Sequence, residues 1–246
     1  MARRSEHTRQ ELKQLALEAA LRLARHQGLS GLTARKIANE MGYTPGTLYL
    51  IFENLDELIL HVNAQTLDDI YELMQSRLTL SGDSSSGVHS IVDAYMQFAT
   101  DNQGLWSCLH EHKIENGKIP EWFESRINRN FKLLETALSR VSGEKGPGLA
   151  VSPGQPVSMD SVFEINSLAV TSDGDTNSLQ MVARALWCAI HGVCVLAMNS
   201  SLNVAGVDST QTLVHYLTDA SLRSLEQEEP CHAGLELSNM SPAGTG

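Results

Sequence analysis

Apolar residues recur every three or four positions along most of the chain, which is the spacing that places them on one face of an α-helix. The first run ends at the stretch HQGLSG, where two glycines interrupt it. Its apolar positions are Leu12, Leu15, Ala16, Ala19 and Leu23. Similar runs follow over residues 55–75, 88–101, 103–114, 121–141, 179–200 and 208–228. The pattern predicts an all-α fold without strands or internal repeats.

Capping signals predict two further short helices between the first two of these runs. Thr33 can cap the first short helix, and Gly42 can end it in the left-handed conformation. After a tight turn, Thr44 can cap the second, whose first position is Pro45, where the missing N–H costs nothing. Asn54 can then cap the long helix that follows.

The elements group into a small N-terminal head and a larger helical body. The head is expected to comprise residues 1–54 and the body residues 55–229. Within the body, residues 143–178 are rich in Gly, Pro, Ser and Asp, so we expect a mostly disordered, flexible insertion. Residues 230–246 are expected to form a disordered tail.

Composition and cysteine spacing indicate a cytoplasmic protein. With 42% hydrophobic residues the chain can bury a large core, and its four cysteines form no CxxC pair. The N-terminus lacks the apolar segment of a signal peptide. The apolar stretch 185–198 is too short to span a bilayer and contains His191, so we expect a buried helix there and no membrane contact.

Charge is distributed unevenly along the chain. The formal net charge is −11, yet residues 1–52 hold eight Lys or Arg against four Glu, a formal charge of +4. The remaining 194 residues therefore carry −15. Because a polyanion is attracted to the N-terminal part and repelled by the rest, the asymmetry suits a DNA-binding head on an acidic body.

The two short helices have the arrangement of a helix-turn-helix, which places the start of its second helix in the major groove. Gly46 allows the backbone to approach closely, Thr47 offers a hydroxyl and a methyl group to base edges, and Tyr49 can reach flanking phosphates. The predicted DNA contacts are Thr33, Arg35, Lys36, Thr44, Pro45, Gly46, Thr47 and Tyr49, with Arg3 and Arg4 in a basic arm.

Residues 8–60 resemble the DNA-binding head of the tetracycline-repressor (TetR) family. The resemblance rests on the opening amphipathic helix and on the stretches GLTARKIANEMGYTPGTLY and FENLDEL. It implies an all-helical homodimer that binds a palindromic operator with two heads, and a C-terminal domain that binds a small ligand and pairs the subunits. Trp187, His191 and Gly192 also resemble the signature of a C-terminal subfamily named for Trp-His-Gly.

Two positions depart from the family pattern. The family usually has His or Tyr before the Phe and Lys after the Asn, both contacting phosphate, whereas this chain has Ile51 and Leu55. The departure implies either weaker non-specific affinity for DNA or greater reliance on Tyr49 and the basic arm. The alternative for the whole segment is an ordinary helical hairpin in which Leu48, Ile51 and Phe52 serve only as core.

Aromatic, histidine and cysteine side chains of the body predict a ligand pocket, because small-molecule sites are mostly apolar clefts with a few polar groups. The predicted lining is Trp106, Cys108, Leu109, His112, Trp122, Trp187, His191 and Cys194. For each residue the alternative is an ordinary place in the core.

The stretch 185–198 carries two apolar stripes at helical spacing, so both of its sides need to be covered. We expect one stripe to face the interior of the subunit and the other to face a two-fold partner, with Gly192 permitting close approach. The predicted dimer interface is Leu186, Ile190, Gly192, Val193, Leu213, Leu217 and Ala220.

The cysteines and histidines offer weaker alternatives. Cys108 and His112 share a helix face, whereas the histidine between them points away. A metal site from these two residues and His191 remains an alternative, although Cys188 and Cys194 are expected to be small buried apolar residues rather than redox sensors. We therefore expect no metal and no cofactor.

The sequence predicts a ligand-responsive transcriptional regulator that binds double-stranded DNA and is released by a small molecule. Most members of the resembling family are repressors. No Ser-His-Asp set, phosphate-binding loop or HExxH sequence indicates an enzyme. Two alternatives remain: an activator or co-regulator that recruits a protein through its acidic body, and a metal- or redox-sensing repressor.

Overall fold

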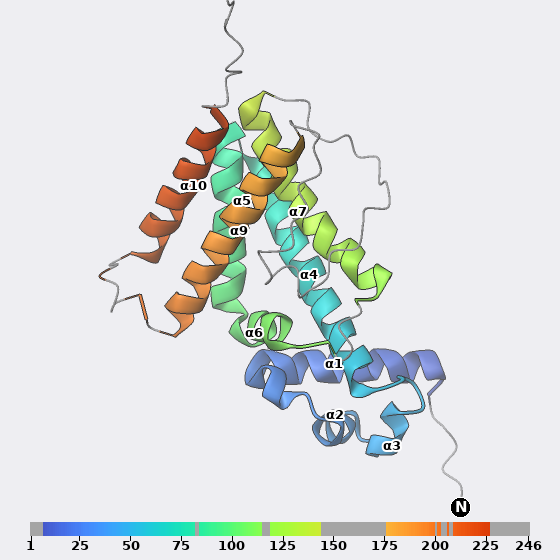
Figure 1. Ribbon diagram of the computed structural model, residues 1–246. Helices are drawn as coiled ribbons and strands as arrows, with labels where there is room; N and C mark the ends of the chain where they lie inside the picture. The colour runs from blue at the N-terminus through green and yellow to red at the C-terminus, as the bar shows by residue number, and fades with distance from the viewer. Residues whose placement is uncertain are drawn as a thin grey trace, which may run out of the picture.

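The computed structural model describes residues 7–81, 84–114, 119–143, 176–199, 201–202, 206 and 209–226. All regular structure in these ranges is helical, which confirms the all-α prediction. The elements are α1 (Arg9–Gln27), the 3₁₀ turn η1 (Leu29–Gly31), α2 (Ala34–Met41), α3 (Pro45–Leu48), α4 (Leu55–Leu80), α5 (Ser84–Asp101), α6 (Gln103–Glu111), α7 (Glu121–Ser142), α9 (Thr176–Met198) and α10 (Thr210–Glu226). Figure 1 shows α1, α2 and α3 forming a head below a bundle of longer helices.

Most of the predicted helix ends in the head are confirmed. The Thr33 hydroxyl accepts a hydrogen bond from the backbone N–H of Lys36 at 3.3 Å, and Gly42 ends α2 with φ 77°. Pro45 is the first residue of α3. Asn54 Oδ1 accepts from the backbone N–H of the residue three positions on, at 2.8 Å, and so caps α4. Local side-chain chemistry therefore sets these boundaries.

The second short helix differs from the prediction in one respect. Thr44 has the extended backbone of an N-cap residue, but its hydroxyl makes no cap and lies 3.5 Å from the hydroxyl of Thr47. The helix α3 is a single turn, after which the N–H of Phe52 donates to the Leu48 carbonyl at 2.9 Å. This turn keeps Ile51 and Phe52 pointing into the head.

Small residues make up the inner face of α1. Its fully buried positions are Ala16, Ala19, Ala20 and Ala24. Because alanines leave little side-chain volume, neighbouring helices can approach the α1 backbone closely. Leu48, Ile51, Phe52 and Leu58 complete the core of the head.

The helix α6 lies crosswise between the head and the bundle (Figure 1). Leu105 and Cys108 are fully buried in the core of the head, whereas Trp106 and Leu109 belong to the core of the body. The long helix α4 is shared in the same way, since its first turns pack on the head and its remainder on the body. These two helices join the head to the body.

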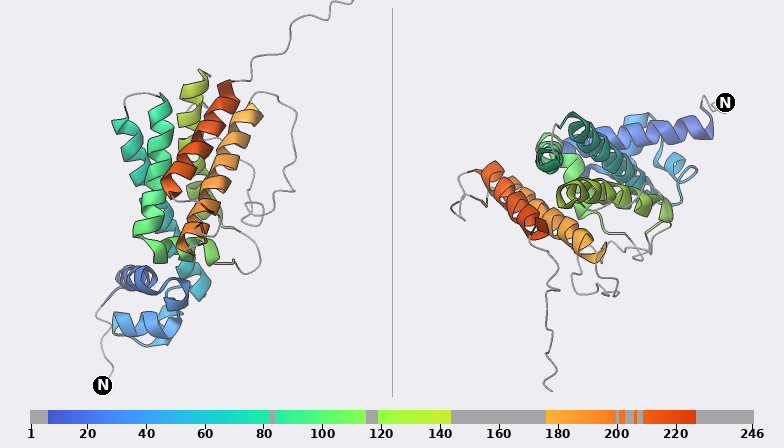
Figure 2. Two further views of the ribbon diagram at one scale, coloured as in Figure 1. Left: turned by 90° about the vertical axis from the view of Figure 1, so that its left-hand side faces the viewer. Right: turned by 90° about the horizontal axis from the view of Figure 1, so that it is seen from above.

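In the bundle, α9 and α10 lie side by side on one flank of α4, α5 and α7 (Figure 2). The predicted insertion, 143–178, lies outside the described residues except at its ends: Gly143 ends α7 with φ 70°, and α9 already begins at Thr176. The predicted tail, 230–246, also lies outside them.

The contact of α6 with α1 generates a stability prediction. A methyl group on Gly104 would lie 2.2 Å from the carbonyl oxygen of Ala24 and 2.5 Å from that of Arg25, so backbone would have to move. Gly104→Ala is therefore expected to lower the free energy of unfolding by about 1–3 kcal/mol, measured by urea denaturation. As a control, Gly46→Ala places its methyl no closer than 3.9 Å to a neighbour and should not destabilise. An unchanged midpoint for Gly104→Ala would contradict this account of the contact.

Candidate nucleic-acid interface and body cavity

The outer surface of α2 and α3 carries the residues predicted to contact DNA. Thr33, Arg35, Lys36, Thr44, Pro45, Gly46 and Tyr49 are exposed, and Thr47 is half-buried. Leu48 and Phe52 point inward and are 3% and 4% exposed. A polar outer surface on an apolar base is the arrangement that a groove-binding helix requires. The alternative, an ordinary helical hairpin, accounts for the buried Leu48 and Phe52 but gives no role to the exposed polar residues.

Two head residues are engaged within the protein: Lys36 is hydrogen-bonded inside the head, and Ile51 is buried in its core. The Nζ of Lys36 donates to Gln27 Oε1 at 2.7 Å, which ties α2 to the end of α1. Ile51 is 4% exposed and belongs to the core of the head, whereas Leu50 is 73% exposed beside it. The predicted arm residues Arg3 and Arg4 lie outside the described residues.

A cavity of about 80 Å³ lies in the body among α4, α5, α6, α7 and α9. Its lining is Leu67, Ile70, Met74, Ile91, Val92, Tyr95, Leu109, His110, Ile127, Asn130, Phe131, Leu134, Trp187 and Ile190. The wall is apolar apart from a few polar side-chain groups, which is typical of a small-molecule site.

A cluster of aromatic and histidine side chains contributes Tyr95, His110 and Trp187 to the wall of this cavity. The hydroxyl of Tyr95 accepts a hydrogen bond from Trp106 Nε1 at 3.2 Å and lies 3.2 Å from His191 Nδ1 and 3.4 Å from His110 Nε2. The His191 ring stacks on Trp106 and on Trp187, with ring centroids 4.9 and 5.1 Å apart.

Burial keeps the polar members of this cluster neutral. It raises the pKa of the Tyr95 hydroxyl and lowers the pKa of His191 to about 4. It also lowers the pKa of His110 well below its usual value, because the charged imidazolium loses its hydration. The cluster therefore adds hydrogen bonds but no charge to the wall at neutral pH.

Four of the residues predicted to line a pocket lie at or beside this cavity. Leu109 and Trp187 line it, and Trp106 and His191 belong to the cluster that contributes to its wall. The sequence reasoning missed the polar wall residues Tyr95, His110 and Asn130. No local signal identifies them, because they come from three helices whose relative rotation is set by packing.

The other four predicted lining residues do not line this cavity. Cys108 is fully buried in the core of the head, and His112 lies between head and body. Trp122 stacks on His61 with ring centroids 4.8 Å apart. Cys194 lines a separate, more polar groove that α5, α6, α9 and α10 border.

The described part of the chain contains no group of three His, Cys, Asp or Glu side chains that could hold a metal ion. Burial raises the pKa of the Cys108 thiol to about 12 and that of Cys194 to about 11, which disfavours the thiolate form that metals and oxidants require. Cys188 is exposed, so the expectation that it is buried is wrong.

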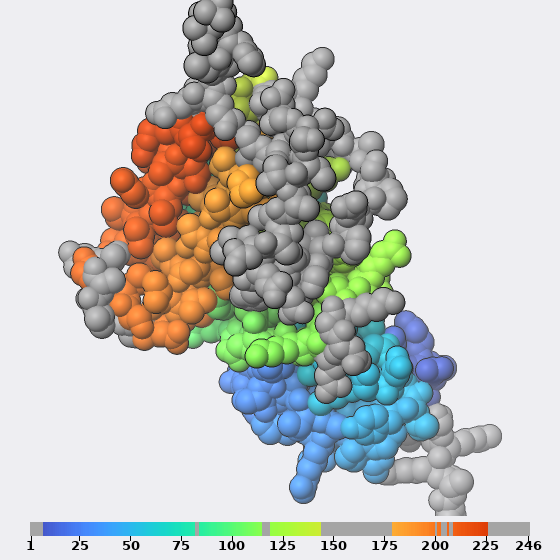
Figure 3. All heavy atoms as spheres, viewed as in Figure 1, coloured from blue at the N-terminus to red at the C-terminus, as the bar shows by residue number. Residues whose placement is uncertain are grey.

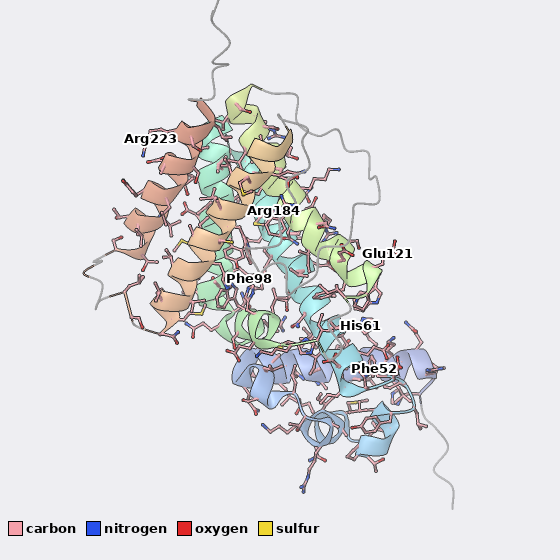
Figure 4. The ribbon with its side chains drawn as sticks, viewed as in Figure 1. Phe52, His61, Phe98, Glu121, Arg184 and Arg223 are labelled. Atoms are coloured by element: carbon pink, nitrogen blue, oxygen red, sulfur yellow. The ribbon has the colours of Figure 1, made fainter. Side chains whose placement is uncertain are left out.

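A polar contact joins α6 to α4 where the head meets the body. His112 Nε2 pairs with Asp56 Oδ1, and His112 Nδ1 lies 3.3 Å from Asn63 Nδ2. Nearby, His61 stands between Phe52 of the head and α7, with its ring centroid 6.0 Å from that of Phe52 (Figure 4). A shift of α6 or α7 relative to α4 would therefore disturb the contacts that orient the head.

The residues of α9 that were predicted to face a dimer partner are buried inside the subunit. Leu186, Ile190 and Val193 are at most 6% exposed and lie in the subunit's own core, so they offer no surface to a partner. Leu213 and Leu217 of α10 are half-buried against that core, and Ala220 is exposed. The side chains that α9 and α10 expose include Met181, Ala185, Cys188, Val195, Leu196 and Tyr216. Figure 3 shows these two helices forming one side of the body surface.

The helix α9 begins at Thr176, nine residues before the apolar stretch 185–198, and one of its faces is exposed. Residues 179–198 are long and apolar enough to cross a membrane by length and composition alone, a property that the core helices of soluble proteins share. The expectation of a buried helix therefore holds for one face of α9 only, because Met181, Val195 and Leu196 on the other face are exposed.

The helix-turn-helix head and helical body define a DNA-binding regulator, and family comparisons identify which kind. Residues 16–62 match the bacterial regulatory proteins of the tetR family, and residues 88–221 match a tetracyclin repressor-like C-terminal domain. The chain therefore belongs to the TetR family of transcription regulators and is not an enzyme. No curated protein matches the sequence.

Several solved structures share the fold. A protein of unknown function from Rhodococcus sp. RHA1 has a TM-score of 0.64 at 16% identity, over 91% of this chain and 98% of that one. A TetR family transcription regulator from Marinobacter aquaeolei VT8 has a TM-score of 0.53 at 16% identity, over 88% and 98%. The regulator FadR from Bacillus subtilis in complex with stearoyl-CoA has a TM-score of 0.52 at 15% identity, over 86% and 96%. At these identities the likeness concerns the fold alone.

The hydrogen bonds of Tyr95 generate a second stability prediction. Tyr95→Phe removes the acceptor of the Trp106 indole N–H and the partner of two buried imidazoles. We expect the free energy of unfolding to fall by about 1–3 kcal/mol in urea denaturation, because buried polar atoms lose their partners. Tyr71→Phe is the control, since it keeps the ring that packs 4.0 Å from the Arg129 guanidinium. Equal stability of the two variants would contradict a role for the Tyr95 hydroxyl.

Proposed function

We propose that this chain is a ligand-responsive transcriptional repressor of the cytoplasm that binds a palindromic operator as a homodimer and is released by a small molecule in the body cavity. The observation that carries the proposal is the double role of α6. Leu109 and His110 of this helix line the cavity, while Leu105 and Cys108 are buried in the core of the head. A molecule in the cavity would thus press on a helix that also supports the head.

The release mechanism follows from the geometry of DNA. Two heads of a dimer fit successive major grooves only when they are about 34–36 Å apart. A ligand that favours a different position of α6 would change this spacing through the contacts of Gly104 with α1 and of His112 with α4. To change the operator from mostly bound to mostly free, the ligand needs a preference of about 5 kcal/mol for the released conformation.

The homodimer is supported by the surface of α9 and α10. Their outward apolar side chains would be covered by the same helices of a second subunit, in a two-fold four-helix arrangement. Gly192 lies on this side, and a methyl group added to it would meet no atom within 4 Å in its own subunit. We assign Trp187, His191 and Gly192 to the Trp-His-Gly type: Trp187 lines the cavity, His191 stacks on it, and the glycine permits close helix packing.

DNA binding is tested by selecting operators from a random pool with the purified protein. We expect a palindrome, because the two heads are related by symmetry. Thr47→Ala should lose about tenfold or more in affinity and relax the preference at the contacted base pair. Thr79→Ala, exposed at the far end of α4, is the matched control and should select the same palindrome. Selection of unrelated sequences by the unaltered protein would contradict operator binding.

The dimer is tested by Gly192→Leu. The added side chain would hold the paired helices apart, so we expect the dimer dissociation constant to rise about tenfold or more, with a matching loss of operator binding. Sedimentation measures the mass, and a gel-shift assay measures the binding. Gln65→Leu adds the same side chain at an exposed position of α4 and should change neither. A dimer mass unaffected by Gly192→Leu would place the interface elsewhere.

A further inference from the structure

The wall of the body cavity carries no charge. None of the cavity-lining residues in the described ranges is Asp, Glu, Lys or Arg, and most of them are aliphatic or aromatic. The two titratable ones, Tyr95 and His110, are held neutral by burial, which raises the pKa of the first and lowers that of the second. An ion that entered the cavity would lose its hydration without gaining a counter-charge, which is strongly unfavourable.

The polar side chains of the wall already interact with one another or with the backbone. The Tyr95 hydroxyl accepts a hydrogen bond from Trp106 Nε1, lies 3.4 Å from His110 Nε2 and interacts with the indole of Trp187. Asn130 donates through Nδ2 to two backbone carbonyl oxygens, and surrounding protein atoms cover its Oδ1, so that no molecule in the cavity reaches this oxygen. A polar group on a ligand would therefore lose its hydrogen bonds to water without an equal gain from the protein.

The size of the cavity limits the molecule that it can hold. Its volume is about 80 Å³, whereas one buried water needs roughly 10–15 Å³. The space therefore suits a molecule of roughly five to ten non-hydrogen atoms, about the size of a single ring. Water itself is a poor occupant, because a stable buried water needs two to four polar partners.

Aromatic side chains give this space rigid walls. Tyr95, His110, Phe131 and Trp187 all line it, and the rings of Phe131 and Trp187 meet edge to face with their centroids 5.5 Å apart. A ring in the cavity would contact the faces and edges of these rings, which is a favourable arrangement for aromatic groups. A rigid ring also loses less conformational freedom on binding than a flexible chain of equal size.

We propose that the cavity takes a small, uncharged, apolar ring compound, of the class of toluene, and that it recognises this compound without a hydrogen bond. The favourable free energy comes from removing apolar surface of ligand and wall from water. Polar and charged analogues of the same shape are rejected because the wall offers them no partner. This inference rests on the proposed function, because it names the ligand class of the same cavity.

The test compares three compounds that share one ring and differ in the attached group: toluene, phenol and benzoate. Titration calorimetry on the full-length protein measures the affinity of each. We expect toluene to bind about tenfold or more tightly than phenol, whose hydroxyl would be buried without a partner. Benzoate should bind about a hundredfold or more weakly than toluene, because its charge would be desolvated.

Two variants that fill the cavity assign the binding to this site. Leu134→Trp and Ile127→Phe each add a larger ring to the wall and should weaken toluene binding about tenfold or more. Circular dichroism checks that the variants fold, and Ile127, which is only half-buried, tolerates the larger side chain more easily than Leu134. Leu80→Trp makes the first substitution at an 82% exposed position outside the cavity and should leave toluene binding unchanged.

The outcomes separate this inference from the proposed function. Phenol or benzoate binding as tightly as toluene, and losing affinity in the filled variants, would overturn the inference and leave the cavity as a ligand site. Toluene binding that survives both filled variants would overturn it as well, and binding of none of the three compounds would overturn it together with the cavity's proposed role. Toluene that binds in the cavity without releasing the selected operator in a gel-shift assay would contradict the release mechanism alone.

Discussion

The close contact of α6 with the end of α1 is the constraint on which the arrangement of this protein depends. Gly104 leaves no room for a side chain against the carbonyls of Ala24 and Arg25, and the alanine face of α1 lets α6 and α2 pack closely. Because Gly104 has no side chain, the backbones of α6 and α1 contact each other directly, and neither helix can shift along the other without a clash. The position of the head is therefore tied to the position of α6, and through α6 to the cavity wall.

The aromatic and histidine cluster beside the body cavity is polar but uncharged. Tyr95 is hydrogen-bonded to the Trp106 indole and lies against two imidazoles that burial keeps neutral. Neutral hydrogen-bonded groups avoid the large desolvation cost of buried ions, yet they still determine side-chain orientations.

The head was largely predictable because its signals are local. Thr33, Gly42, Pro45 and Asn54 act within a turn of their own position, and each lies at the helix end where its chemistry predicted it. The cavity was predictable only in part. Leu109 and Trp187 line it, but Cys108 turns toward the head, and His112, just past the end of α6, pairs with Asp56. A helix that is apolar on several sides has no unique inward face in sequence, so its rotation depends on its neighbours.

The sequence by itself determined the helical class, the ends of the short helices, the basic head and the acidic remainder, because periodicity, capping and charge are properties of neighbouring residues. Only the tertiary structure decided which stripe of α9 is buried, that Tyr95 and His110 meet at the cavity wall, and that α6 serves head and body together. These features arise from packing between helices distant in the chain, where the shapes of both partners settle which side chains meet.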